Sequence, residues 1–411
     1  MFETKHAMIK PIFCFSFFFI LYFSLNAQTP EYRWKRVSTE YGDIPLPGDG
    51  KIQVQCLVAD FTKNGKDDFI IIDNTDNQPI VIYTNVGNTK WEVSIVEKRK
   101  ISAGEAAAYF DIDNDGDLDI AVGSEETNQI WWWENPYPDI DTPRGWKRNY
   151  IKKDGEPLHN NMAFGDFDGD HQIELAFWNQ GANSLFIAEK PENVEKADNW
   201  PLTCVYTYST DGQMQQRDKN TEPNQLGTNY HGGMAVADIN NDGTDDIVAG
   251  GMWFQYLNGT YISNPVDLSY SSAMIAAGQL IEGGRPEIVM VSGYGSGPLI
   301  LYQYVDHVWI PKELDKTTKY AHTLQLIDFN KDGLLDIFSA EMKIKANKNP
   351  GIFILLNKGQ GDFERINISN NFGSHNSGIG DLDGNGEFDI VVKPNTWDTP
   401  RIDLWLNQGL K

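Results

Sequence analysis

Cysteine is scarce in this sequence, with three residues in 411. Cys14 lies inside an apolar run near the amino terminus, which leaves Cys56 and Cys204 for the folded protein. Cys56 belongs to an apolar segment that is expected to form the innermost strand of one β-sheet. Cys204 is expected on the outermost strand of another sheet. Because such strands lie far apart, no disulfide is expected between them, even in an oxidising compartment. We predict that both are buried thiols.

Basic residues are also few. The chain has 34 lysines and arginines against 58 aspartates and glutamates, a net charge of −24 at pH 7. Nucleic acids and anionic membranes select basic surfaces, so neither is expected as a partner. Much of the negative charge comes from short acidic loops, and bound Ca²⁺ would offset part of it. No Ser/His/Asp order, glycine-rich phosphate loop or CxxC pair stands out in the sequence.

Long apolar runs are missing except at the amino terminus. There the run from Ile12 to Leu25 follows Lys5 and Lys10 and ends near a passable cleavage site at residues 25–27. This pattern indicates a secretory signal peptide over residues 1–27, too short for a membrane span. We therefore expect an exported protein, periplasmic or extracellular, with no membrane span in the mature chain. Residues 28–411 show no linker or low-complexity tract and are expected to form a single domain.

What the sequence does contain is a short acidic loop that recurs. Residues 111–119 read DIDNDGDLD, with carboxylates at positions 1, 3, 5 and 9 and glycine at position 6. Alternate aspartates folded around a glycine turn supply the oxygen ligands that Ca²⁺ prefers. A helix-flanked calcium loop would carry glutamate at position 12, where this chain has Val122. We therefore predict a calcium loop between two strands.

The loop has three further complete copies, which begin at Asp238, Asp328 and Asp381. The candidate calcium ligands are Asp111, Asp113, Asp115 and Asp119; Asp238, Asn240, Asp242 and Asp246; Asp328, Asn330, Asp332 and Asp336; and Asp381, Asp383, Asn385 and Asp389. Copies that begin at Asp60 and Asp166 are expected to bind more weakly. The segment Gly278–Gly284 keeps only the position and length of the loop within its repeat, and it is expected to bind nothing.

These seven copies begin 51, 55, 72, 40, 50 and 53 residues apart. Repeats of about 40–50 residues with several short strands each are typical of a β-propeller. The predicted fold class is therefore all-β, a seven-bladed β-propeller with four-stranded antiparallel blades. The last repeat stops one strand short, and residues 34–37 match the missing strand. We expect this N-terminal strand to complete the last blade, because closure removes exposed sheet edges.

Over residues 34–411 the loops and strands resemble the FG-GAP/VCBS repeat family, whose propellers include the heads of integrin α-subunits. The resemblance implies a propeller fold stabilised by several Ca²⁺ ions. It implies no particular activity, because function resides in sites carried by a fold.

Histidines gather at one place in the repeat. Of seven histidines, His6 falls in the signal peptide, and four of the other six precede a loop by six or seven residues. They are His159, His231, His322 and His375, and Glu105 holds the same place in the second repeat. All five are expected at the channel mouth opposite the acidic loops. Imidazole is the commonest ligand of Zn²⁺ and similar ions. We predict Zn²⁺ or another divalent transition metal there; the alternative is a polar ring around a solvated channel.

Further candidate residues fall on loops of the same face. For substrate contacts the candidates are Trp178, Asn179, Tyr294, Trp397 and Asp398. Aromatic faces beside amides and carboxylates suit sugar rings, although a single tryptophan here could equally pack between blades. For catalysis the candidates are Glu341, Tyr230 and Lys393, and an unliganded histidine could serve in their place.

Two functional hypotheses follow. More remotely, the pattern resembles the propeller domain of aldos-2-ulose dehydratase, a metal-dependent enzyme that eliminates water from a keto sugar. That resemblance implies a metal-dependent carbohydrate lyase or dehydratase that works by β-elimination. The alternative is a non-catalytic propeller that binds a glycan or a protein partner. An enzyme is expected to hold a transition metal besides Ca²⁺, and a binding module Ca²⁺ alone.

Overall fold

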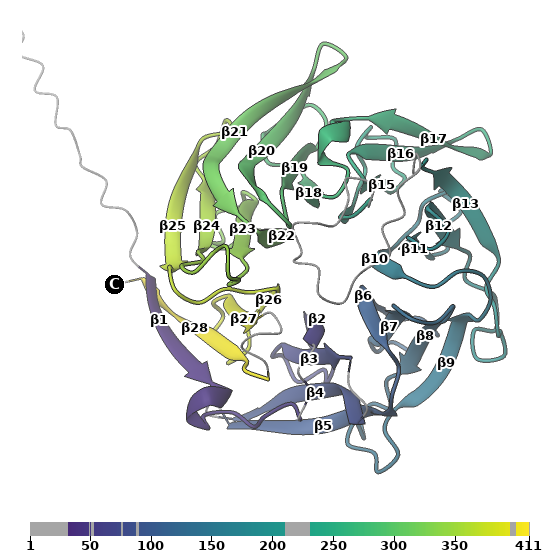
Figure 1. Ribbon diagram of the computed structural model, residues 1–411, viewed down its shortest axis with the longest axis vertical. Coiled ribbons are helices and arrows are strands. Elements are labelled where there is room, and N and C mark those ends of the chain that lie inside the picture. Colours follow the sequence, from purple (N-terminus) through teal and green to yellow (C-terminus); the bar gives the residue numbers. More distant parts are fainter. Residues whose placement is uncertain are drawn as a thin grey trace, which may run out of the picture.

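The computed structural model describes residues 32–48, 50, 53–74, 77–87, 90–209, 231–394 and 400–410. These residues form an all-β ring of sheets (Figure 1). Residues of the innermost strands line a central cavity, called the channel below. Among them the only helical segments are two 3-10 turns, η1 (Thr39–Tyr41) and η3 (Leu268–Tyr270). The predicted signal peptide, residues 1–27, lies outside the described residues.

The strands form four concentric layers. The innermost strands are β2 (Gln53–Ala59), β6 (Ala103–Phe110), β10 (His159–Gly165), β14 (Met234–Ala237), β18 (Met274–Gly278), β22 (Ala321–Ile327) and β26 (Asn376–Gly380). The second strands are β3 (Asp68–Asp73), β7 (Asp119–Ser124), β11 (Glu174–Asn179), β15 (Asp246–Ala249), β19 (Glu287–Val291), β23 (Asp336–Glu341) and β27 (Asp389–Lys393). The third strands are β4 (Asn77–Gly87), β8 (Ile130–Glu134), β12 (Ser184–Ala188), β16 (Met252–Leu257), β20 (Ser296–Val305), β24 (Ile352–Asn357) and β28 (Asp403–Leu410). The outermost strands are β5 (Lys90–Arg99), β9 (Lys147–Lys152), β13 (Leu202–Thr207), β17 (Thr260–Pro265), β21 (Val308–Lys319), β25 (Phe363–Ser369) and β1 (Tyr32–Ser38).

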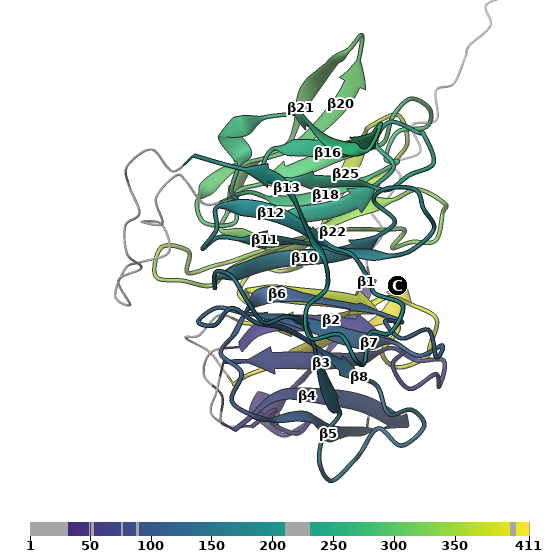
Figure 2. The ribbon, with the colours of Figure 1, turned by 90° about the vertical axis from the view of Figure 1, so that its right-hand side faces the viewer.

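Hydrogen bonding groups the described strands into five four-stranded sheets and one of eight strands. The eight-stranded sheet consists of β6–β9 and β10–β13, joined where Asn160 of β10 pairs in parallel with Glu105 of β6. The described part of the chain thus contains seven four-stranded antiparallel units, in accordance with the predicted seven blades. In Figure 2 the hairpin of β20 and β21 projects beyond the body of the ring.

The core lies between neighbouring sheets and follows from strand alternation. In β8, Trp131 and Trp133 pack with residues of β3 and β4 in the preceding sheet. Trp132 points to the other face and packs with Phe177 of the following four-stranded unit. Successive side chains of a strand point to opposite faces, so a sheet buried on both faces needs apolar residues at consecutive positions. This explains the run of three tryptophans.

The N-terminal strand closes the ring as predicted. β1 pairs antiparallel with β28, with Val37 opposite Leu404. Val37 is buried, and Arg36 donates a hydrogen bond of 2.7 Å to Oδ1 of the buried Asp403. The sheet β1-β28-β27-β26 is therefore assembled from the two ends of the described chain.

Deleting residues 28–38 is expected to cause aggregation or loss of cooperative unfolding. The deletion removes β1, exposes the edge of β28 and leaves Asp403 without its Arg36 partner. Light scattering and thermal unfolding measure both effects. Deleting residues 28–31, which precede β1, is the matched control and should be harmless. A soluble, equally stable 28–38 deletion would contradict the closure.

The two cysteines lie on the layers expected of them. Cys56 is on the innermost strand β2 and is buried, where burial raises the pKa of its thiol to about 12. Cys204 is on the outermost strand β13 and is exposed, so the prediction of burial was wrong for this residue. The outermost strand β13 is covered by protein on one side only, and most of its residues, Cys204 included, are exposed or half-buried. Within the described ranges, no helix is long and apolar enough to cross a membrane.

Candidate functional site

The acidic loops connect innermost to second strands and share one backbone conformation. In residues 111–119, the fourth and sixth residues are left-handed, with φ of 63° at Asn114 and 93° at Gly116. This turn lets the amide of Gly116 donate to Oδ2 of Asp111 at 3.0 Å. The same bond recurs from Gly243 to Asp238, from Gly333 to Asp328 and from Gly386 to Asp381. The first carboxylate therefore organises each loop.

The ninth residue ties the loop to the sheet. Asp119 is fully buried, and its two oxygens accept from the amides of Ile112 at 2.9 Å and Asn135 at 2.8 Å. Asp336 and Asp389 are held by the equivalent amides. Burial, together with the nearby Asp113, raises the pKa of Asp119 to about 8. Such a carboxylate is unfavourable when ionised unless a cation lies beside it.

The loops present groups of carboxylates that can hold a metal ion. Three such groups, each with ligand oxygens within 4.8 Å of one another, are Asp111, Asp113 and Asp115; Asp166, Asp168 and Glu174; and Asp381, Asp383 and Asp389. Burial and neighbouring carboxylates raise the pKa of Asp113 and of Asp168. This excess of negative charge and the hard oxygen donors fit Ca²⁺. The Asp166 loop, predicted to be weak, assembles as many carboxylates as the others.

Replacing His171 by glycine is expected to raise the free energy of unfolding by about 1 kcal/mol. His171 occupies position 6 of the Asp166 loop with φ of 69°, where the complete loops have glycine. Its ring is 93% exposed, so it contributes no packing that the substitution would remove. Denaturant unfolding with saturating calcium measures the change, and Gly116→His is the converse control. A His171→Gly protein no more stable than the parent would contradict the assigned strain.

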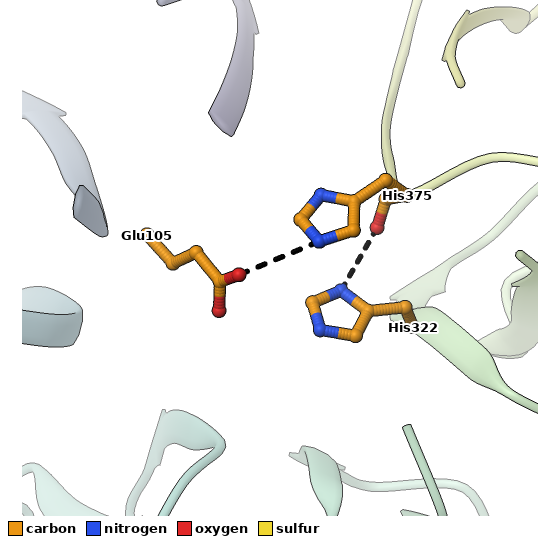
Figure 3. Close-up of side chains that lie close together, drawn as sticks. All are labelled: Glu105, His322 and His375. Atoms are coloured by element: carbon orange, nitrogen blue, oxygen red, sulfur yellow. Dashed lines mark hydrogen bonds and ion pairs between the residues drawn. The ribbon is translucent and has the colours of Figure 1, made fainter. Parts of the chain in front are cut away.

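A second cluster lies at the channel mouth on the opposite face. Glu105 on β6, His322 on β22 and His375 just before β26 bring ligand atoms within 4.8 Å of one another (Figure 3). Nε2 of His375 lies 3.4 Å from Oε1 of Glu105. The two imidazoles stack with centroids 4.2 Å apart and planes inclined by 18°. The strands are not sequential neighbours, so the ring itself brings these side chains together.

One nitrogen of this cluster is buried without a partner. Nδ1 of His322 bonds the backbone carbonyl of His375 at 2.9 Å, which turns Nε2 toward the cluster. His322 is only 4% exposed, and among the described residues its Nε2 has no hydrogen-bond partner. An unsatisfied buried polar atom costs about 1–3 kcal/mol, so it points to a missing ligand.

The protonation states of the cluster are those of a metal site. Burial lowers the pKa of His375 to about 3, and it also lowers the pKa of His322. Burial alone would raise the pKa of Glu105, but hydrogen bonds from His375 and Tyr294 hold it well below its usual range. A carboxylate and two neutral imidazoles are the forms that bind metals. Two histidines with one carboxylate match catalytic zinc and non-haem iron sites.

Two further side chains support these three. The hydroxyl of Tyr294 donates to Oε2 of Glu105 at 2.9 Å, and its ring meets His322 edge-on at 4.8 Å. Nζ of Lys393 lies 3.3 Å from Nδ1 of His375. Lys393 is fully buried, and burial lowers its pKa to about 8. Its ammonium donates to Nδ1 of His375, which places the proton of this imidazole on Nε2, facing Glu105, where a bound metal would replace it.

Two of the predicted ligands lie outside this cluster. Nδ1 of His159 lies 2.7 Å from the carbonyl of Ser124, and its Nε2 lies 3.1 Å from Nζ of the buried Lys152. Gly123 leaves room for this ring, since a Cβ there would lie 2.6 Å from Cβ of His159. His231 stacks on Tyr208 with centroids 4.1 Å apart. Neither belongs to a metal-holding group among the described residues, which corrects the prediction of a five-residue site.

Glu341 is engaged by its own loop. Its carboxylate accepts from the amides of Lys319 and Gly351, both at 2.8 Å, and from Asn347 at 3.2 Å. It therefore holds the β23–β24 loop, which does not suit the role of proton acceptor predicted for it.

Trp178 and Asn179 are buried rather than presented to a ligand. Nε1 of Trp178 donates to the carbonyl of Gly233 at 3.3 Å, and Asn179 donates to that of Glu156 at 2.9 Å. This corrects their assignment to substrate contacts and bears out the alternative of inter-blade packing for Trp178. Tyr230, Trp397 and Asp398 lie outside the described residues.

Sequence patterns missed two residues that brace Glu105. Gln55 of β2 donates to the backbone carbonyl of Glu105 and accepts from Asn376 at 2.6 Å. This pair of amides links β6, β2 and β26 across three neighbouring sheets. The position of Asn376 beside His375 was the one available signal, whereas nothing in the sequence singles out Gln55.

Comparison with known proteins agrees with the loops and the fold. Residues 60–122, 111–177 and 328–392 match the family model described as FG-GAP-like repeat. These three segments are therefore similar to FG-GAP-like repeats. A search of curated proteins found no match.

Among the similar solved structures is that of BBS1N, a β-propeller. Two crystal structures of BBS1N in complex with ARL6DN match. The crystal soaked with mercury is 10% identical, with 91% of this chain and 96% of that chain covered and a TM-score of 0.50. The crystal soaked with lead is 8% identical, with 86% and 92% covered and a TM-score of 0.51. At these identities the likeness shows the fold alone.

Proposed function

We propose that this protein is an exported, calcium-stabilised propeller that acts as a metal-dependent carbohydrate lyase or dehydratase. The observation that carries the proposal is the convergence of Glu105, His322 and His375 at the channel mouth. In support, the buried Nε2 of His322 has no hydrogen-bond partner among the described residues and belongs to a group of three ligand atoms close enough to share one metal ion. The acidic loops supply rigidity at the opposite face and take no part in the chemistry.

The reaction is a β-elimination on a sugar. Glu105, His322 and His375 would hold a divalent transition metal, which when bound would supply Lewis acidity toward a carbonyl or carboxylate of the sugar and so favour loss of the neighbouring C–H proton. A base removes that proton, the C–H electron pair forms a C=C bond, and the C–O bond at the β-carbon breaks. The departing oxygen takes a proton, so the products are an unsaturated sugar and water or a shortened glycan.

Tyr294 is the side chain best suited to exchange protons with the sugar. It is part-exposed, and its hydroxyl lies 2.9 Å from Oε2 of Glu105. Lys393 is fully buried and contacts His375, so it acts as a positioning residue rather than on the substrate itself.

The test measures metal content and turnover together. The parent should hold one tightly bound transition metal per chain and should form unsaturated product from a glycan, followed by ultraviolet absorbance. Glu105→Gln should lose both, whereas Glu92→Gln, a substitution of an exposed glutamate on β5, should lose neither. A parent that binds only calcium and converts no glycan would overturn the proposal.

A binding propeller without catalysis remains the second candidate. It is favoured by the low exposure of His322 and His375, which are 4% and 8% exposed and so offer little surface to a substrate. On that hypothesis the parent binds a glycan or a protein partner, and the bound ligand is recovered unchanged after long incubation.

A further inference from the structure

Beside the candidate centre the chain carries a group of exposed lysines that we call the basic rim. Its members are Lys316 and Lys319 on β21, and Lys345 and Lys348 in the β23–β24 loop. Residues 342–350 contain no acidic side chain, in a protein with 58 acidic residues against 34 basic ones. The charge of this segment is therefore opposite in sign to the net charge of the protein.

The basic rim adjoins the candidate centre. The amide of Met342 donates to the carbonyl of Tyr320 at 2.8 Å, and that of Tyr320 donates to Gly295 at 2.6 Å. Tyr294 packs against the small apolar cluster formed by Tyr320, Met342 and Ile344. The same tyrosine donates to Glu105. These contacts therefore form a continuous path of packed and hydrogen-bonded residues from the lysine-bearing loop to the metal-holding side chains.

Glu341 fixes the rim in place. Its carboxylate joins the amide of Lys319, at the end of β21, to that of Gly351, at the end of the loop. Asn347 lies inside the loop and donates to the carbonyl of Lys319 and to Glu341, both at 3.2 Å. The buried Asn347 thus presents its neighbours Lys345 and Lys348 outward, where both are exposed.

The lysines of the basic rim differ from several other lysines of the protein in their ion pairing. Elsewhere lysines are paired, such as Lys147 with Glu134 and Glu195, and Lys358 with Glu364. Among the described residues, none of the four rim lysines forms an ion pair. The acidic loops lie at the opposite ends of the innermost strands, so their carboxylates do not neutralise this face. A local positive field of this kind attracts anions despite a negative net charge.

We infer that the substrate is an acidic polysaccharide, with carboxylate or sulfate groups that the basic rim binds. The inference rests on the proposed function and specifies its substrate class. Lysine ammonium groups on flexible stems suit anions spaced along a polymer. A uronic acid also places a carboxylate next to the C–H that β-elimination must break, so one group serves both binding and activation. The negative charge of the whole protein disfavours nucleic acid as the occupant.

Binding by the metal-loaded mature protein tests the inference. The ligands are a polyuronic acid, a sulfated glycan and a neutral glucan, each titrated at several salt concentrations. Lys345→Glu/Lys348→Glu should weaken binding of an acidic chain by about tenfold or more and flatten its salt dependence. Lys90→Glu/Lys196→Glu makes the same charge change on exposed lysines where third strands turn into outermost ones, and should leave affinity unchanged.

The outcomes separate the inference from the proposed function. If the neutral glucan binds or reacts as well as the acidic chains, the inference fails while the enzyme proposal stands. If the rim variant binds an acidic chain as tightly as the parent, or single-stranded DNA competes equally, the inference also fails. If the acidic chains bind through the rim but are recovered unchanged, the inference holds for binding and the lyase proposal fails.

Discussion

Chelation of calcium is expected to lower the midpoint temperature of unfolding by about 10 °C or more. A ligand at about 100 times its dissociation constant stabilises the folded state by about 2.7 kcal/mol per site, and several loops lose their ion together. The loss is large because each loop holds carboxylates that repel one another. Asp113, for example, has a raised pKa because of burial and of Asp115 beside it. Scanning calorimetry with and without chelator measures the effect.

The calcium-free protein should also become less stable as pH rises. Burial raises the pKa of Asp119 to about 8, and that of Asp389 to about 7, above the ordinary value of 3.8. Between about pH 4 and pH 8 the folded state therefore binds more protons than the unfolded state, so the free energy of unfolding falls across this window. Calcium replaces those protons, and the calcium-saturated protein should show a much smaller slope. An unchanged melting temperature after chelation at pH 8 would contradict the calcium assignment.

A matched pair of variants ties the effect to the loops. Asp332 and Glu282 stand at position 5 of the loops that begin at Asp328 and Gly278. Asp332→Ala should reduce the number of bound calcium ions by one. Glu282→Ala should leave the number unchanged, because the loop at residues 278–284 has no carboxylate at positions 1 and 3.

Replacing His322 by alanine is expected to weaken binding of the transition metal by at least about 100-fold, because it removes one of three ligands. Tyr294→Phe removes only the hydrogen bond to Glu105 and should weaken it by about 10-fold. Calcium content should not change in either variant, since the acidic loops lie on the opposite face. Competition with a chelating dye measures the affinity, and elemental analysis gives the metal content.

His159→Ala is the control for residue type. It should keep the transition metal but lower the melting temperature, because Lys152 would lose the imidazole that lies 3.1 Å from its ammonium. Equal metal content in the His322, His159 and parent proteins would mean that the channel mouth is merely a solvated polar ring. The binding-propeller hypothesis would then replace the enzyme.

The agreement between sequence and structure is best where the signal is local. Residues 111–119 specify their own turn, because Gly116 and Asn114 adopt left-handed backbone conformations and Asp111 receives the resulting amide. The closure of β1 on β28 was also predictable, since the last repeat lacked one strand of a period that the others kept.

Agreement fails where the direction of a side chain matters. His159 and His322 hold nearly the same place in their repeats, yet one faces Lys152 and the other the candidate centre. The two imidazoles differ in their partners, since His159 contacts the carbonyl of Ser124 and the ammonium of Lys152, whereas Nδ1 of His322 contacts the carbonyl of His375. Glu341 looked like a free carboxylate because the amides that it binds belong to Lys319 and Gly351, outside its own strand.

By itself, the sequence determined the repeat, the all-β blades, the acidic loops and the N-terminal strand that completes the last sheet. All of these depend on contacts within a repeat or on its period along the chain. The tertiary structure alone decided that Glu105 meets His322 and His375, and that Tyr294 and Lys393 join them. These side chains come from sheets on different sides of the channel, and their distances depend on how the ring closes, which no local pattern encodes.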